Sequence, residues 1–303
     1  MSRKRIVIAG GSGFIGSALA HKCYTQFGEV VVLTRTPRAR NDGVVEVEWS
    51  GAHVGEWITH LDGAEAVINL TGKNINCRHT PENLRELLES RVQSIRAITL
   101  ALEHVKNPPR VWVQAGAIGF YGDKQDKICD ENSLNGLDPV ADICRQWEYA
   151  FSLAPAPKTR KVLLRIGVVL DSKGGALPIL ARMTKWFLGG RAGNGQQFIS
   201  WIYRKDLVRI FSEAITRADW SGTFNAVGPN PVTNAEFMRT LRRALHRPWS
   251  PPAPAWAVKV GARLMGTDPS LALSGCRVVP KRLTDVGFSF VFPDLGEALK
   301  DIF

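Results

Sequence analysis

Seven residues near the start of the chain have the spacing of a phosphate-binding loop. They are Gly10, Gly11, Ser12, Gly13, Phe14, Ile15 and Gly16, and they fit the pattern G-x-x-G-x-x-G. Glycines permit a tight turn and let backbone N–H groups approach a pyrophosphate, while the N-terminus of a following helix favours negative charge. A glycine triplet also occurs in ordinary turns, but here an apolar run precedes it and a helical pattern follows it. The pattern therefore predicts a dinucleotide-binding loop.

The end of the second apolar run indicates which dinucleotide is bound. A site for NAD usually places an Asp or Glu about 20 residues after the glycine loop, where it holds the ribose 2′-hydroxyl. This sequence has Thr34 and Arg35 there, and its next acid is Asp42. A guanidinium binds a 2′-phosphate through charge-assisted hydrogen bonds. We therefore predict NADP(H) as the cofactor, with Arg35 as the main contact and Arg38 as a second one. A solvated loop arginine is the alternative.

Apolar runs that alternate with helical patterns must position this loop. The runs span residues 6–9, 30–33, 66–70, 111–113 and 162–165. The segment 81–105 between two of them has the apolar spacing of one long amphipathic helix. Strands that alternate with helices predict right-handed βαβ units. We therefore expect an α/β fold, in which a Rossmann-like, doubly wound parallel sheet is followed by a smaller, irregular C-terminal lobe.

Glycine pairs and a proline-rich connector divide the chain after about residue 170. We expect an NADP-binding domain over 1–170 and a substrate lobe over 171–303, with a segment at about 198–228 returning to the first domain.

Positive charge is concentrated in the second half of the chain. Residues 1–150 hold 17 Lys and Arg against 18 Asp and Glu, whereas residues 151–303 hold 22 Lys and Arg against 10 Asp and Glu. A basic half attracts phosphorylated substrates, nucleic acid or an anionic membrane surface, and a merely solubilising surface is the alternative.

Composition excludes several classes of protein. With 303 residues, 45% of them hydrophobic and 22% charged, the chain is neither disordered nor collagen-like. Its five cysteines lack any C-x-x-C spacing, so we expect no metal site. No signal-type apolar region follows Met1, and no apolar stretch approaches the roughly 18 residues of a membrane-spanning helix. We therefore expect a cytoplasmic protein without membrane association.

Several segments besides the glycine loop resemble the extended, epimerase-like form of the short-chain dehydrogenase/reductase superfamily. They are residues 67–72, 119–123, 165–170 and 201–207. The first is similar to the turn after the fourth strand that lies along the cofactor, so the resemblance implies cofactor contacts from Leu70, Thr71 and Gly72. It implies a further cofactor contact from Arg165. The resemblance also implies a Rossmann-like fold and NADP binding, without identifying a substrate.

Later segments are similar to an atypical subgroup whose members are labelled epimerase family protein or sugar nucleotide epimerase, and in some cases cell division inhibitor. These segments are residues 189–202, 224–227 and 279–283. The stretch from about 251 to 303 resembles the characteristic C-terminal domain of that subgroup. Family position implies that Gln196, Trp201 and Tyr203 lie on the substrate side, although Trp201 is equally compatible with the core.

The catalytic residues of the superfamily are replaced in this chain. In the wider superfamily a Ser after the fifth strand orients the substrate carbonyl, and a Tyr-x-x-x-Lys on the next helix supplies a proton donor and a lysine that lowers its pKa. Here residues 115–117 read Ala-Gly-Ala, and Cys144 and Glu148 stand where Tyr and Lys are expected. Because a carboxylate raises the pKa of a neighbouring acid, we expect Cys144 to remain a thiol. The usual mechanism does not carry over.

The remaining candidates for proton transfer are Tyr121, Cys144 and Glu148. A hydride arriving at a carbonyl carbon requires a proton delivered to its oxygen, and each of these side chains carries a dissociable proton. Each also has a structural explanation. Tyr121 can cover the nucleotide pocket and Cys144 can be a small buried residue. Glu148 can pair with Arg145 or cap a neighbouring helix.

Three hypotheses for the function follow. The first is an NADP(H)-binding oxidoreductase or epimerase-like protein that acts on a small, anionic molecule. The second keeps the fold and the cofactor but makes the chain a non-catalytic regulatory or redox-sensing binding protein, as the replaced catalytic residues allow. Nucleic-acid binding through the basic half ranks third, because no known reader motif accompanies the charge. A monomer and a homodimer are both compatible with the sequence.

Overall fold

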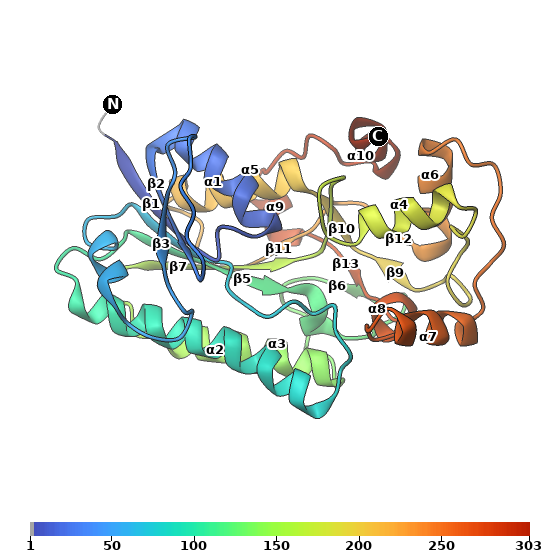
Figure 1. Cartoon of the computed structure of the whole chain (residues 1–303), viewed down its shortest axis with the longest axis horizontal. Coiled ribbons are helices and arrows are strands. Elements are labelled where there is room, and N and C mark those ends of the chain that lie inside the picture. Colours follow the sequence, from blue (N-terminus) through green and yellow to red (C-terminus); the bar gives the residue numbers. More distant parts are fainter. Residues whose placement is uncertain (1–2) are drawn as a thin grey trace.

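Five apolar runs and two further segments form one seven-stranded sheet (Figure 1). The computed structural model describes residues 3–303, so Met1 and Ser2 lie outside the described residues. The strands of this sheet are β1 (Lys4–Ala9), β2 (Gly28–Thr34), β3 (Val45–Glu48), β4 (Ala66–Asn69), β5 (Val111–Ala117), β7 (Arg160–Ile166) and β11 (Gly222–Ala226). They lie in the order β11-β7-β5-β4-β1-β2-β3, and every neighbouring pair is parallel. The predicted Rossmann-like parallel sheet is confirmed.

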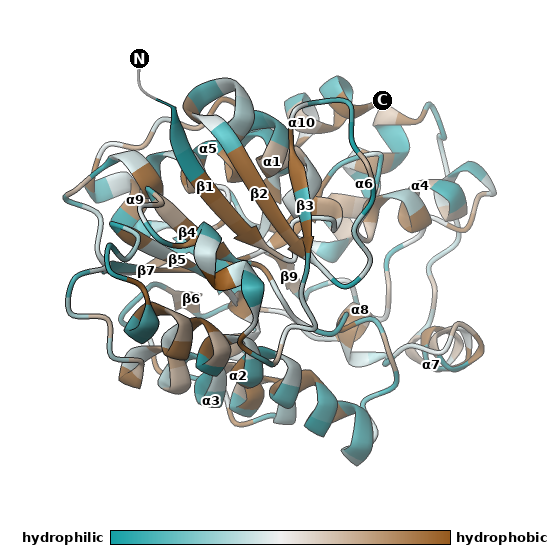
Figure 2. Cartoon of the chain, turned by 60° about the vertical axis from the view of Figure 1, so that its left-hand side comes forward, coloured by the Kyte–Doolittle hydropathy of each residue, from teal (hydrophilic) through white to brown (hydrophobic). Residues whose placement is uncertain are grey.

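Helices cover both faces of the sheet. One face carries α2 (Pro81–His104) and α3 (Pro139–Leu153), which lie side by side below the sheet in Figure 1. The opposite face carries α1 (Phe14–Phe27), α5 (Arg204–Thr216) and α9 (Lys281–Asp285). In Figure 2 the inner parts of β1 and β2 are coloured as hydrophobic, whereas the helices also carry hydrophilic faces. This layering is the one that a doubly wound sheet requires.

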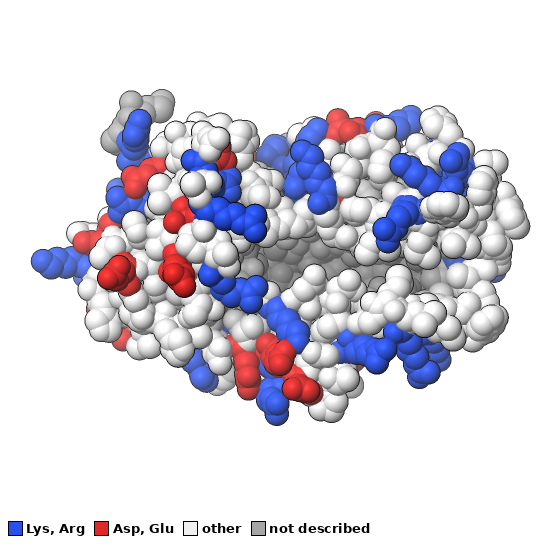
Figure 3. Space-filling model, viewed as in Figure 1, with Lys and Arg blue, Asp and Glu red and all other residues white. Residues whose placement is uncertain are grey.

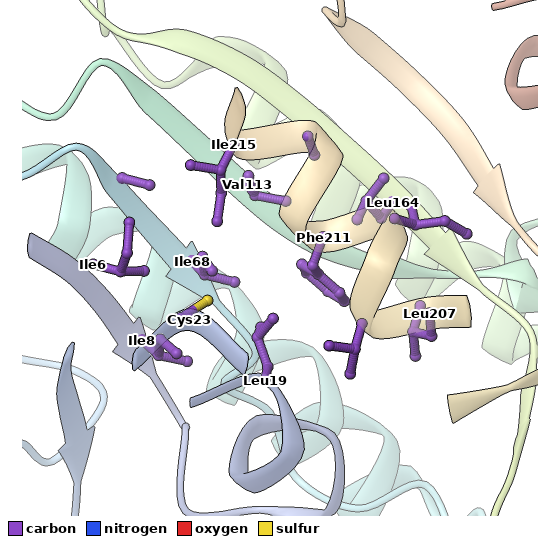
Figure 4. Close-up of a cluster of buried hydrophobic side chains, with 14 of the residues drawn as sticks. Ile6, Ile8, Leu19, Cys23, Ile68, Val113, Leu164, Leu207, Phe211 and Ile215 are labelled. Atoms are coloured by element: carbon purple, nitrogen blue, oxygen red, sulfur yellow. The ribbon is translucent and has the colours of Figure 1, made fainter. Parts of the chain in front are cut away.

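Consecutive residues of the central strands enter two separate hydrophobic clusters. Ile6 and Ile8 of β1 pack with α1 and α5, whereas Val7 and Ala9 pack on the side of α2. All four side chains are fully buried. Figure 4 shows the first cluster, in which side chains of α1 and α5, Phe211 among them, point toward the strands. Burial on both faces explains why the sequence shows continuous apolar runs here instead of alternation.

Capping residues fix where the two helices of the lower layer begin. The segment 81–105 predicts one helix, and α2 ends one residue earlier, with Thr80 as its N-cap accepting a hydrogen bond from a backbone N–H of the first turn. Asp138 caps α3 in the same way and accepts from two backbone N–H groups. The cap of α3 therefore sets the position of Cys144 and Glu148 along the sheet.

A smaller, irregular lobe continues from the sheet, on the right in Figure 1. Its helices are α4 (Leu177–Lys185), α6 (Asn234–Ala244), α7 (Ala255–Leu264), α8 (Ser270–Leu273) and α10 (Leu295–Ile302). Its strands form two-stranded pairs: β8 (Val168–Leu170) with β10 (Trp201–Tyr203), β9 (Phe198–Ile199) with β12 (Val232–Thr233), and β6 (Ile128–Cys129) with β13 (Arg277–Val278). Two 3-10 helices, η1 (Glu56–His60) and η2 (Ile118–Tyr121), connect elements of the first domain.

The edge strands of the main sheet, β3 and β11, were not predicted from the sequence. β3 reads Val-Glu-Val-Glu and is partly exposed, so it lacks a continuous apolar run. β11 comes late in the chain, after the first elements of the smaller lobe, and pairs with β7. It lies within the segment 198–228 that we expected to return to the first domain. The domain boundaries themselves stay predictions.

Candidate functional site

The strand order reverses between β1 and β4, and a cavity opens at this point. In doubly wound sheets, ligands bind beyond the carboxyl ends of the strands at such a reversal. The cavity has a volume of about 750 Å³. Its lining residues are Gly10, Ser12, Gly13, Leu33, Thr34, Arg35, Trp49, Ser50, Gly51, Leu70, Thr71, Gly72, Lys73, Asn74, Glu86, Glu89, Ser90 and Gln93. The glycine loop, the end of β2 and the turn after β4 are thus brought together as the sequence predicts.

Glycines shape the part of the cavity next to α1. Gly10 has a φ of +74°, a left-handed conformation that favours glycine. A Cβ on Gly16 would lie 2.5 Å from the Cα of Gly11, so the first turn of α1 packs directly on the loop. A Cβ on Gly13 would meet only the carbonyl oxygen of Gly10, at 3.5 Å. Because Gly13 lines the cavity, its missing side chain leaves room for a ligand.

The N-terminus of α1 can bind an anion. The N-cap Gly13 has no side chain to accept from the first turn, and that turn holds no acidic residue. The first N–H groups of a helix have no partners within the helix, and the helix dipole favours negative charge there. This helix end adjoins the cavity, so its geometry fits the pyrophosphate of a dinucleotide.

Hydrogen bonds hold the strand ends around the cavity. The hydroxyl oxygens of Ser12 and Thr34 lie 2.9 Å apart and join the glycine loop to the end of β2. The backbone N–H of Leu70 donates to the carbonyl of Ala9 and joins β4 to β1. Within residues 3–303 the hydroxyl of Thr71 is buried and has no hydrogen-bond partner. An orphaned hydroxyl at the cavity wall also fits a polar ligand.

The arginines after β2 differ in whether they are already paired. Arg35 is exposed and lines the cavity, and no carboxylate among residues 3–303 pairs with it. Arg40 forms ion pairs with Asp42 and Glu46. Its hydrogen bonds to Asp42 lower the pKa of that carboxyl to about 2. Arg38 is exposed but does not line the cavity, and its backbone N–H donates to Glu46. Of these three arginines, only Arg35 is a cavity wall residue.

Three predicted cofactor residues, Gly11, Phe14 and Ile15, are not among those that line the cavity. Gly11 packs against β2, because a Cβ there would lie 2.8 Å from the side chain of Val32. The ring of Phe14 lies against Gly174, where an added Cβ would be 2.4 Å from it. Ile15 packs against the core on the α1 side of the sheet. Contacts from the backbone N–H groups of Phe14 and Ile15 stay predictions.

Some lining residues escaped the sequence analysis. Trp49, Ser50 and Gly51 follow β3, so they could be placed only once that edge strand was known. Lys73 follows the predicted residue Gly72 directly, and it forms an ion pair with Glu86 of α2. Its position next to the predicted turn was the one feature of the sequence that could have placed Lys73 at the cavity.

The predicted cofactor contact Arg165 lies instead in a buried network beside the end of β5. Its guanidinium donates two hydrogen bonds to Glu148 of α3, at 2.9 and 2.8 Å, and one to the phenol oxygen of Tyr121, at 2.8 Å. The Tyr121 hydroxyl in turn donates to the Oδ1 of Asn225, at 2.7 Å. Arg165 is buried and does not line the cavity. Its side chain is held by these partners, and a cofactor contact from Arg165 stays a prediction.

Burial keeps the protons on two of the candidate acids. Desolvation raises the pKa of Tyr121 to about 12, because a buried phenolate loses its hydration. Desolvation, assisted by the negative charge of Glu148, raises the pKa of the Cys144 thiol to about 12. The prediction that Cys144 remains a thiol agrees with this direction. Both groups are buried and protonated near neutral pH.

Glu148 lies closest to the place of the missing serine. A Cβ built on Gly116 of β5 would be 3.6 Å from the Oε1 of Glu148. Burial raises the pKa of Glu148 despite the guanidinium of Arg165. The alternative pairing with Arg145 is wrong, because Arg145 binds Asp142 on the exposed side of α3. The helix thus turns the carboxyl group toward β5.

The predicted substrate residues do not form one site. Trp201 is buried, and its indole N–H donates to the carbonyl of Asn230. Tyr203 is buried, and its hydroxyl donates to a carboxylate oxygen of Asp301, at 2.6 Å. Both belong to the hydrophobic core of the smaller lobe, which agrees with the core alternative for Trp201, and their substrate contacts stay predictions. Gln196 is exposed in the loop before β9.

Figure 3 shows a hollow that runs across the middle of this face, with Lys and Arg above and below it. Fields of one sign around a hollow attract ligands of the opposite sign.

Residues 3–303 hold no group of three or more His, Cys, Asp or Glu side chains that could bind a metal ion. No helix within the same residues has the length and apolar character needed to cross a membrane.

Two family models match parts of the chain. The NAD dependent epimerase/dehydratase family matches residues 6–146, and a domain of unknown function, DUF1731, matches residues 253–302. The second match confirms the predicted resemblance of the stretch from about 251 to a characteristic C-terminal domain. The first covers the cavity, Tyr121 and Cys144.

Relatives extend over nearly the whole chain. The epimerase family protein SDR39U1 homolog, chloroplastic, of Arabidopsis thaliana is 35% identical, over 99% of this chain and 87% of its own. The crystal structure of human epimerase family protein SDR39U1 (isoform 2) with NADPH is 32% identical, with a TM-score of 0.87 and 98% of each chain covered. A nucleoside-diphosphate sugar epimerase of Corynebacterium glutamicum is 30% identical, with a TM-score of 0.79, over 99% of this chain and 58% of that one.

Proposed function

Because the chain belongs to the epimerase family of the extended short-chain dehydrogenases/reductases, we propose that it binds NADP(H) in the cavity and acts as an oxidoreductase or epimerase-like protein. The observation that carries this proposal is Arg35, an unpaired cation at the cavity wall where an NAD site has an acid. NADPH in the human relative supports the same assignment. We propose the cytoplasm as its location and an anionic small molecule as its substrate.

The proposed binding mode assigns a part of the cofactor to each element of the cavity. The N-terminus of α1 and Gly13 take the pyrophosphate. Arg35 takes the 2′-phosphate through charge-assisted hydrogen bonds. The turn Leu70–Gly72 lies along the cofactor toward the end of β5, where Glu148 borders Gly116. When bound, the nicotinamide supplies or accepts a hydride.

Calorimetric titration of the purified chain with NADPH and NADH tests the binding proposal. We expect NADPH to bind more tightly than NADH, because only NADPH carries the phosphate that Arg35 would hold. A Gly13→Val variant serves as the control, since its side chain would fill the space at the helix end. We expect this variant to lose affinity for both dinucleotides. Absence of binding by the unmodified chain would overturn the proposal.

We propose Glu148 as the proton-handling group of the reaction, with Arg165 as the residue that positions it. The side chain of Glu148 is 10% exposed. Tyr121 is fully buried, and its hydroxyl is hydrogen-bonded to both Asn225 and Arg165. The raised pKa of Glu148 brings its proton nearer to the range where general acids work. A Glu148→Gln variant should keep NADPH affinity and lose turnover of a substrate found by screening, by about 100-fold or more.

The hydrogen bonds that hold Tyr121 and Arg165 within the protein favour a second candidate function, a non-catalytic binding protein that responds to the redox state of NADP(H). A buried polar network whose members bind one another is typical of a structural core. If this candidate is right, a metabolite library gives no oxidation, reduction or epimerisation with the cofactor-loaded chain. Pull-downs should then recover a partner that differs between NADP and NADPH. Turnover that Glu148→Gln abolishes would reject this candidate.

A further inference from the structure

A second group of unpaired cations lies in the smaller lobe, away from the cavity. From Phe237 to Thr267 the chain holds six Lys and Arg but no Asp or Glu. Two segments meet here: residues 185–188, at the end of α4, and residues 239–249, which comprise the second half of α6 and the residues after it. We name them together the basic–aromatic patch. In Figure 3 the visible surface over α4 and α6 carries Lys and Arg without Asp or Glu.

Hydrogen bonds join the two segments into one surface. Arg242 donates from Nη1 to the carbonyl of Gly189, at 2.8 Å. Arg247 donates from Nε to the carbonyl of Lys185, at 3.3 Å, and its guanidinium lies 5.4 Å from the centroid of the Phe187 ring. The end of α6 therefore also stabilises the end of α4, and the exposed side chains of both segments share one surface.

The cations of the patch have no acidic partners. A pocket of about 420 Å³ is lined by Arg239, Arg242, Arg243, His246, Arg247 and Pro248. No carboxylate among residues 3–303 pairs with any of these four arginines. The Nε of Arg242 is buried without a hydrogen-bond partner within the same residues. Gathered like charges without counter-charges favour binding of an anion with several negative groups.

Large apolar side chains stand next to these cations. Trp186 is 76% exposed, Leu188 58% and Trp249 65%. Phe187 has a φ of +61°, a conformation that bulky residues rarely adopt. Strain of this kind persists only where the surrounding structure enforces it, and it is frequent at binding sites. The patch thus combines exposed apolar groups with a local excess of positive charge.

We propose that the basic–aromatic patch binds the surface of an anionic lipid bilayer. Arginines attract anionic headgroups, and Trp is enriched at the headgroup level because its ring is amphipathic. Apolar side chains beside cations are the composition of surfaces that lie in the membrane interface. The sequence predicts no membrane association because it lacks a signal-type region and a spanning stretch, and neither feature bears on peripheral binding. The proposal is independent of the proposed catalytic function.

Two other occupants fit the patch less well. A second copy of the chain packed across a two-fold axis would place the arginines of both patches against each other, and like charges repel. Single-stranded nucleic acid would use the aromatic rings as stacking platforms, but it would leave the aliphatic Leu188 unused. A bilayer accommodates the cations, the indoles and Leu188 together.

Helix α7 lies at the same end of the molecule as α4 and α6 but apart from them (Figures 1 and 2), and it carries a second exposed apolar surface. Trp256, Val260 and Leu264 are exposed at positions i, i+4 and i+8, so they form one stripe along the helix. Lys259 and Arg263 are close to this stripe in the sequence. The connector that leaves the patch at Trp249 leads directly into this helix.

Vesicle flotation of the full chain tests the proposal. We expect binding to vesicles of phosphatidylcholine with phosphatidylglycerol, weakening with salt, and no binding to phosphatidylcholine alone. The double variant Arg239→Gln/Arg243→Gln should bind about 30-fold more weakly, because each cation near an anionic surface contributes about fivefold. Trp186→Ser/Leu188→Ser should weaken binding at every salt concentration. The matched controls Lys106→Gln and Leu137→Ser, exposed on other surfaces, should bind as the unmodified chain does.

Three results would overturn the proposal. The first is no flotation with anionic vesicles. The second is equal flotation of the unmodified chain with neutral vesicles, because the arginines would then play no part. The third is a salt-dependent shift of a single-stranded oligonucleotide that Arg239→Gln/Arg243→Gln abolishes while vesicles stay unbound, which would assign the patch to nucleic acid. An unchanged free energy of unfolding in each variant, measured by chemical denaturation, shows that it is folded.

Discussion

The dinucleotide cavity and the network around Arg165 both place an arginine where the family resemblance predicts a cofactor contact, yet they treat it in opposite ways. Arg35 is exposed at the cavity wall and has no acidic partner. Arg165 is buried and is bound by both Glu148 and Tyr121. A group kept for a ligand is left unpaired, whereas a group that holds the fold is paired within the protein.

The largest effect should come from breaking the paired region. Arg165→Leu leaves the carboxyl of Glu148 buried without its cation, so we expect the free energy of unfolding to fall by about 3 to 5 kcal/mol. Chemical denaturation followed by tryptophan fluorescence measures it. Arg96→Leu, on the exposed side of α2, is the control and should change little. A loss below about 1 kcal/mol in Arg165→Leu would mean that the network is not structural.

A smaller effect should come from crowding the glycine loop. In Gly16→Val the new side chain meets the backbone of Gly11, so we expect unfolding free energy to fall by about 1 to 3 kcal/mol and dinucleotide affinity to fall with it. Gly13→Ala is the matched variant, because its Cβ has space within the protein. It should keep its stability and lose only affinity. Equal stability losses at the two positions would contradict the separation of packing from binding.

The pH dependence of stability tests whether burial dominates at Glu148. Its pKa in the folded chain lies above 4.5, so the folded state holds this proton more tightly than the unfolded state does. The stability from this group is fully present below pH 4.5 and is lost as the pH rises through the raised pKa. Unfolding free energies of the unmodified chain and of Glu148→Gln should be measured from below pH 4.5 upward. The unmodified chain should lose stability relative to Glu148→Gln as the pH rises. Divergence in the opposite sense would mean that Arg165 outweighs burial.

The smallest effect should come from the exposed pair beside Arg35. Asp42→Asn removes a partner of Arg40 at the surface, so we expect a stability loss below about 1 kcal/mol and no change in NADPH affinity. The pKa of Asp42 is about 2, so its contribution is present above 3.8 and is lost as the pH falls toward 2. Denaturation at pH 7 measures the loss. A changed NADPH affinity would show that Asp42 acts in the cavity.

Most of the sheet, and eight of the eighteen residues that line the cavity, could be predicted from the sequence. Continuous apolar runs identified five buried strands, because a parallel strand is covered on both faces. The alternating residues of β3 gave no such signal, and so Trp49 and its neighbours could not be placed at the cavity.

Side-chain roles were harder to predict than backbone positions. Trp201 and Tyr203 occupy family positions on the substrate side, but their own hydrogen bonds hold them in the core. Arg165 likewise binds Glu148, a partner separated from it in sequence. Whether Arg35 or Arg165 is paired with a carboxylate depends on contacts between residues far apart in the sequence. The pattern of a single sequence does not show such contacts.

The most direct test of the account is a cycle of four titrations, of NADPH and NADH with the unmodified chain and with Arg35→Ala. We expect Arg35→Ala to weaken NADPH binding by about 1.5 to 3 kcal/mol and to leave NADH binding unchanged, since only NADPH carries the 2′-phosphate. Arg38→Ala, outside the cavity wall, should have little effect on either. Equal weakening of both dinucleotides by Arg35→Ala, or tighter binding of NADH by the unmodified chain, would contradict the account.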